Sequence, residues 1–73
     1  MKKKTLEENI VNGLAKLYEG QIAVAYANIK VYLENPSGIG EHSEVLQAID
    51  AEISKYAEAE EKLNVLVRIH SGR

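Results

Sequence analysis

The sequence contains no cysteine, so neither a disulfide nor a thiolate metal site holds the chain together. It also lacks tryptophan and phenylalanine, and it has a single proline. No apolar stretch approaches the ~20 residues that a membrane-spanning helix needs. The N-terminus lacks the apolar run of a secretory signal. We therefore expect a cytoplasmic protein with no membrane segment, folded by packing of its apolar side chains alone.

The charge is close to balanced, with a formal net charge of −2. A dedicated nucleic-acid-binding protein usually shows a strong basic excess, so we expect no nucleic acid as partner. The one basic run is Lys2, Lys3 and Lys4. We interpret it as a solubilising tail, and an electrostatic contact with phosphate or lipid headgroups is the alternative.

The length of 73 residues sets a demand on the core. Hydrophobic residues make up 45% of the chain and charged residues 27%, a composition typical of folded domains. Ordering a residue costs roughly 1.5 kcal/mol and burial returns about 25 cal/mol per Å², so the chain needs on the order of 4,000 Å² of buried apolar surface. Two helices that share one seam do not reach this area, and we expect the chain to self-associate.

The positions of proline and glycine divide the chain into three parts. Residues 5–34 contain no proline, residues 35–42 hold the only proline and two glycines, and residues 43–69 contain neither. This distribution of proline and glycine predicts one all-α domain over residues 1–73, with helices at 5–34 and 43–69 joined by a turn at 35–42. Thr5 and Glu8 fit a capping box at the start of the first helix. A turn this short makes the helices antiparallel neighbours, a two-helix hairpin.

The first helix carries two apolar stripes. One follows alternating steps of four and three residues and mixes large with small side chains: Leu6, Ile10, Gly13, Leu17, Gly20, Val24, Ala27 and Val31. The other comprises Val11, Leu14, Tyr18, Ile22, Ala25, Ile29 and Leu33. The second helix can cover only one stripe, which leaves the other for a second copy and predicts a homodimeric four-helix bundle. The predicted self-association residues are Ile10, Gly13, Leu17, Gly20, Val24, Ala27 and Val31.

Two glycines in the first stripe, Gly13 and Gly20, are unusual because glycine inside a helix costs about 1 kcal/mol relative to alanine. Their seven-residue spacing on one face indicates close approach of another helix. The alternative is that they are tolerated defects or produce a bend.

The second helix shows a single apolar seam. Its members are Leu46, Ile49, Ile53, Tyr56, Glu60, Leu63, Val67 and His70, flanked by Val45, Ala59 and Leu66. Glu60 interrupts the seam, and we expect it to turn to the rim while Ala59 fills the space. The alternative is a buried polar residue that fixes the helix register. On the opposite face, Glu58 and Lys62 are spaced for a favourable ion pair.

The turn is the one segment with unusual chemistry. Gly38 and Gly40 surround Ile39, and Glu41 and His42 precede a helix N-terminus, an end that can bind anions through free N–H groups. A lone G-x-G is a weak phosphate signal. We therefore favour a structural turn plugged by Ile39, and a small-anion or ligand-binding module at residues 36–44 is the alternative.

Catalytic and metal patterns are missing from the sequence. The chain has one aspartate, two histidines and no E-x-x-H pair, and no serine stands in a nucleophile context. We expect neither an enzyme nor a protein with a metal or cofactor.

The turn sequence carries a resemblance. Residues 32–66 resemble a family of small uncharacterised proteins of tailed bacteriophages, including marine ones, whose hallmark is an N-P-x-G-I-G-E-H turn between two helices. The matching residues here are Asn35, Pro36, Gly38, Ile39, Gly40, Glu41 and His42. The family often has proline after the histidine, where this chain has Ser43. The resemblance implies a phage origin and a helical hairpin but no mechanism. We expect a phage accessory protein that acts by self-association, as a dimer, and by binding a host or virion protein.

Overall fold

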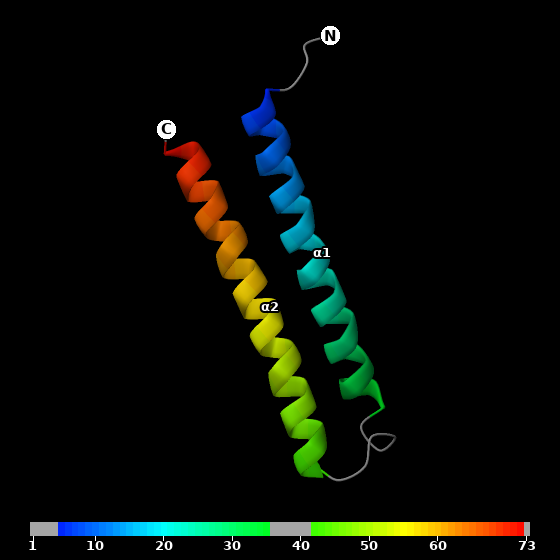
Figure 1. Cartoon of the computed structure of the whole chain (residues 1–73). Coiled ribbons are helices and arrows are strands. Elements are labelled where there is room, and N and C mark those ends of the chain that lie inside the picture. Colours follow the sequence, from blue (N-terminus) through cyan, green and yellow to red (C-terminus); the bar gives the residue numbers. More distant parts are fainter. Residues whose placement is uncertain (1–4, 36–41, 73) are drawn as a thin grey trace.

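The computed structural model describes residues 5–35 and 42–72, which form two α-helices (Figure 1). Helix α1 runs from Leu6 to Glu34 and helix α2 from His42 to Ser71. The described residues include no strand, so the prediction of an all-helical hairpin is confirmed for them. Helix α1 ends where predicted. Helix α2 begins one residue earlier and ends two residues later than predicted.

The start of α1 is a capping box, as predicted. The Glu8 backbone N–H donates to Thr5 Oγ1 at 3.1 Å, and the Thr5 backbone N–H donates to Glu8 Oε1 at 2.8 Å. These two bonds satisfy amide groups that have no partner within the helix. At the other end, the Asn35 N–H donates to the Val31 carbonyl at 3.0 Å and completes the last turn.

The charges of α2 agree with the expected helix chemistry. Lys62 Nζ lies 3.2 Å from a Glu58 carboxylate oxygen, which confirms the predicted pair. Arg68 and His70 lie in the last turn of α2, where a positive charge interacts favourably with the helix dipole. The side chains of His42 and Ser43, at the start of α2, lie outside the described set.

The helices lie antiparallel and side by side along their length (Figure 1). The chain extends 54 × 24 × 13 Å, so it is one layer of helices thick. Its radius of gyration is 16.7 Å, whereas a compact chain of this length has about 11 Å. Most domains close their core between two layers. A single layer leaves both broad faces of the hairpin open.

The seam between the helices uses the second stripe of α1. Ala25 is buried with 1% exposure, and the half-buried members of the stripe are Val11, Leu14, Tyr18, Ile22 and Ile29. Leu33 is 59% exposed, so its assignment to this stripe was wrong. The half-buried Tyr32 continues the seven-residue rhythm of Val11, Tyr18 and Ala25 instead.

The predicted seam of α2 was partly wrong. Its members Ile49, Tyr56 and Leu63 are half-buried at the seam, but Leu46, Ile53, Glu60, Val67 and His70 are exposed. The flanking positions take their place: Val45 and Ala59 are buried and Leu66 is half-buried, with Glu52 completing the seven-residue repeat. Helix α2 is therefore rotated about its own axis, by about one residue, relative to the orientation that the predicted seam implied. Small Ala59 faces α1 and Glu60 stays at the surface, as expected for that pair.

The core that results is small. Among the described residues only Ala25, Val45, Glu52 and Ala59 are buried, and no large side chain is fully buried. The chain exposes 5808 Å², whereas a compact monomer of 8.1 kDa exposes about 4,500 Å². It buries about half of its extended-chain surface, against roughly 60% for a 60-residue domain.

Two further contacts join the helices near the chain termini. His70 Nδ1 lies 3.7 Å from Glu7 Oε2, and Lys62 Nζ lies 6.0 Å from the centre of the Tyr18 ring. The first contact is exposed and the second joins the exposed Lys62 to the half-buried Tyr18, so both add little to the seam. In the described parts of the chain, neither helix has an apolar stretch long enough to cross a bilayer.

Candidate interaction surface

The first apolar stripe of α1 is open to solvent. We call Leu6, Ile10, Gly13, Leu17, Gly20, Val24, Ala27 and Val31 the α1 stripe. Its five large side chains are each more than half exposed: Leu6 75%, Ile10 54%, Leu17 52%, Val24 63% and Val31 58%. A Cβ placed on Gly13 or Gly20 meets nothing within 4 Å. Helix α2 is therefore not the helix whose close approach these glycines predict.

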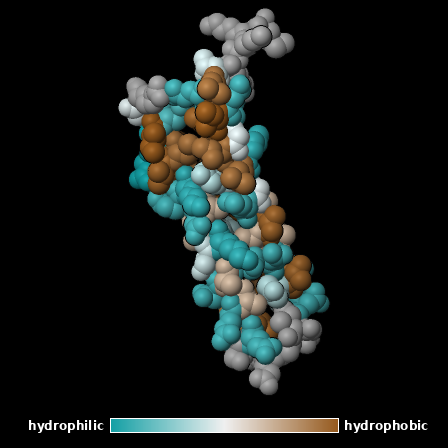
Figure 2. Space-filling model, viewed as in Figure 1, coloured by the Kyte–Doolittle hydropathy of each residue, from teal (hydrophilic) through white to brown (hydrophobic). Residues whose placement is uncertain are grey.

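The α1 stripe lies on one broad face of the hairpin. Ile10, Leu17 and Val24 each precede a seam residue of α1 by one position. The exposed Leu46 and Ile53 of α2 each follow a seam residue by one position. Because the helices are antiparallel, these opposite offsets place the two sets on opposite faces. Figure 2 shows apolar surface along α1, widest near the chain termini, where it continues onto α2.

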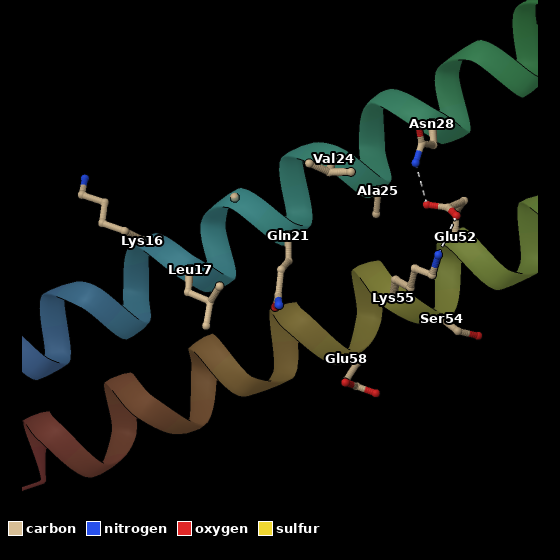
Figure 3. A pocket seen from close by; sticks show the side chains of 11 residues that line it. Lys16, Leu17, Gln21, Val24, Ala25, Asn28, Glu52, Ser54, Lys55 and Glu58 are labelled. Atoms are coloured by element: carbon tan, nitrogen blue, oxygen red, sulfur yellow. Dashed lines mark hydrogen bonds and ion pairs between the residues drawn. The ribbon is translucent and has the colours of Figure 1, made fainter.

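A groove borders the α1 stripe on this face. It has a volume of about 650 Å³ and lies between the middle of α1 and the middle of α2 (Figure 3). Leu17, Gly20, Val24 and Ala25 line its α1 side together with the polar Lys16, Gln21 and Asn28, and the α2 side is lined by Glu52, Ser54, Lys55 and Glu58. The groove therefore has a mixed wall on α1, with apolar side chains from the stripe, and a polar wall on α2.

A polar cluster lies at one end of the groove. The Asn28 side-chain amide donates to Glu52 Oε1 at 3.0 Å, and Lys55 Nζ donates to Glu52 Oε2 at 3.1 Å (Figure 3). Glu52 is only 8% exposed. The Asn28 hydrogen bond, followed by the Lys55 hydrogen bond and charge, lowers the pKa of the Glu52 carboxyl despite its burial. The carboxylate is therefore ionised at neutral pH, which suits a structural contact better than general acid–base chemistry.

The sequence pattern did not reveal this cluster. A buried polar seam residue was an alternative only at Glu60, whereas the residue in that role is Glu52. The signal was present, since Val45, Glu52, Ala59 and Leu66 repeat every seven residues. The predicted seam, shifted by one position, was richer in large apolar residues and hid this repeat.

Most of the turn motif lies outside the described residues. Pro36, Gly38, Ile39, Gly40 and Glu41 belong to that part, as does the His42 side chain. Asn35 is exposed and forms the C-cap of α1. Within residues 5–35 and 42–72, no group of three or more acidic or histidine side chains could hold a metal ion.

Comparisons with other proteins give no further assignment. No protein-family model matches the chain, and neither curated proteins nor solved structures provide a match.

Proposed function

We propose that this protein is a non-enzymatic interaction protein that self-associates through the α1 stripe, with two hairpins pairing as a homodimeric four-helix bundle. The observation that carries this proposal is the row of five large apolar side chains on α1, each more than half exposed. Neighbouring apolar side chains on one face are typical of a surface that a protein partner covers.

The excess surface of the whole chain, both broad faces together, is of the size that such a dimer buries. The surface exceeds that of a compact monomer of equal mass by about 1,300 Å². A standard protein interface takes about 800 Å² from each partner. A second hairpin on the stripe face also supplies the second layer that the single-layer hairpin lacks.

The turn sequence supports a more specific role. Its resemblance to small proteins of tailed bacteriophages suggests an accessory protein that works in the host cytoplasm and binds a host or virion protein. Self-association through the α1 stripe leaves the opposite face open to that partner. Four exposed apolar residues lie there toward the turn, Tyr26, Leu33, Leu46 and Ile53.

Molar mass measured by light scattering across a hundredfold concentration range tests the dimer, with a helix melt at each concentration. We expect a dimer whose melting temperature rises with concentration, because mass action favours the associated state. Leu17→Glu and Val24→Glu place charges on the stripe and should produce monomers. Leu46→Glu is the matched control, because Leu46 is 69% exposed on the opposite face. A wild-type monomer at every concentration, folded as well as the control, contradicts the proposal.

A further inference from the structure

The large and small residues of the α1 stripe alternate in a way that specifies how a second copy binds. Ile10, Leu17, Val24 and Val31 occupy one heptad position. Gly13, Gly20 and Ala27 occupy the other, together with Leu6. Parallel α1 helices would stack equal positions, so large side chains would meet at some levels and glycines at others. The glycine levels would then contain voids, which a packed interface avoids.

Antiparallel α1 helices instead place one heptad position opposite the other. In one register Leu17 lies opposite the partner's Gly20, Val24 opposite the partner's Gly13, and Ile10 opposite the partner's Ala27. Val31 then meets the partner's Leu6, so every member of the stripe is paired. A shift by one heptad places Ile10 opposite the partner's Glu34 and leaves Leu6 unpaired.

We propose that two copies pair through antiparallel α1 helices, with Leu17 of each seated against the partner's Gly20, so that each hairpin completes the other's groove. This inference rests on the proposed self-association and specifies its geometry. In this register the groove beside Gly20 and Val24 receives Leu17 and Ile10 of the second copy. Neither the volume of about 650 Å³ nor the open Cβ position at Gly20 is filled within one chain.

The polar cluster lies beside the partner's side chains in this arrangement. Asn28 comes level with the partner's Ile10, whose side chain covers the open side of the Asn28–Glu52 hydrogen bond. Among the described residues that are not exposed, Glu52 included, no buried side-chain polar atom lacks a hydrogen bond.

Disulfide trapping tests the orientation, since the natural sequence has no cysteine. Ile10→Cys and Ala27→Cys are made as separate proteins, mixed, unfolded, refolded together and mildly oxidised. In the proposed register the two positions face each other across the dimer, so the mixture should cross-link as a heterodimer. Neither variant should cross-link alone, because equal positions lie about 25 Å apart along antiparallel helices, far beyond disulfide reach.

A second pair, Gly13→Cys with Val24→Cys, repeats the test at another level and guards against a variant that fails to fold. Efficient cross-linking of Ile10→Cys with itself, without a gain in the mixture, would overturn the antiparallel register. A dimer by light scattering in which neither the mixtures nor the single variants cross-link would also overturn the register but leave self-association standing. A monomeric wild-type protein would overturn the proposed function and this inference together.

Discussion

Asn28 on α1 and Glu52 on α2 are joined by a 3.0 Å hydrogen bond across the seam of the hairpin. The donor is a neutral amide and the acceptor is the carboxylate of Glu52, a residue that is 8% exposed. A charge-assisted bond of this kind has strict geometric needs. Sliding one helix along the other by a turn would leave the carboxylate without Asn28. The pair therefore favours the observed register, because neighbouring registers do not bring Asn28 and Glu52 together.

The Asn28–Glu52 pair predicts how stability changes with pH. Because the folded state lowers the pKa of Glu52, its contribution to stability is fully present above the ordinary pKa of a glutamate, about 4.3. It is lost as the pH falls through the lower folded-state pKa. Glu52→Gln should therefore flatten the pH dependence of the free energy of unfolding in the acid range, as measured by chemical denaturation at each pH.

The contribution of each partner to Glu52 can be separated by NMR titration of its carboxyl carbon. Asn28→Ala and Lys55→Ala should each raise the pKa of Glu52, because the Asn28 hydrogen bond is the largest single cause of the lowered value and Lys55 lowers it through both a hydrogen bond and its charge. An unchanged titration in Asn28→Ala would show that the amide does not hold the carboxylate in solution. All titrations should be run at one protein concentration, since self-association alters apparent stability.

The buried position of Ala59 predicts that the seam has no room for a larger side chain there. It is 2% exposed on α2, whereas Ala57, two residues earlier, is exposed on the same helix. Ala59→Leu should reduce the free energy of unfolding by about 1–3 kcal/mol, the usual cost of forcing extra volume into a packed site. Ala57→Leu should change it by less than about 0.5 kcal/mol, as expected at the surface. If urea denaturation gave the same free-energy change for Ala59→Leu and Ala57→Leu, Ala59 would not face α1.

These residues also show how far the sequence alone could lead. The start of α1 could be predicted from Thr5 and Glu8, and its end from the single proline, because caps and helix breakers act locally. The rotation of α2 was missed because Val45 and Leu46 are adjacent and both apolar, so periodicity alone could not choose between their stripes. The Asn28–Glu52 bond was missed because it joins residues far apart in the chain, and only the register of the two helices brings them together.

The Thr5 cap predicts how much the start of α1 contributes to the stability of the hairpin. Thr5→Ala removes the hydroxyl that accepts the Glu8 N–H and should cost about 1 kcal/mol of stability. Thr5→Ser keeps the hydroxyl and should remain close to wild type. Thermal melts followed by circular dichroism at equal concentration measure the difference. If both variants melt together, the capping box contributes nothing measurable.

A substitution at Gly20 distinguishes an α1 stripe that is exposed to solvent from one that a second helix covers. In one hairpin a methyl group at this position meets nothing within 4 Å. Gly20→Ala should therefore stabilise an isolated hairpin by about 1 kcal/mol through helix propensity. In the proposed dimer the same methyl group meets the partner's Leu17 and pushes the two α1 helices apart, and overpacking of this kind costs about 1–3 kcal/mol.

We therefore expect Gly20→Ala to raise the dimer dissociation constant by roughly tenfold or more, although helix content in the dilute monomer increases. Asn12→Ala is the matched control, because Asn12 is exposed on α1 away from the stripe and its replacement also favours helix. It should leave the dissociation constant unchanged. Sedimentation equilibrium of both variants decides the matter: if Gly20→Ala binds itself as tightly as Asn12→Ala, no helix lies against Gly20, and the dimer must use another face.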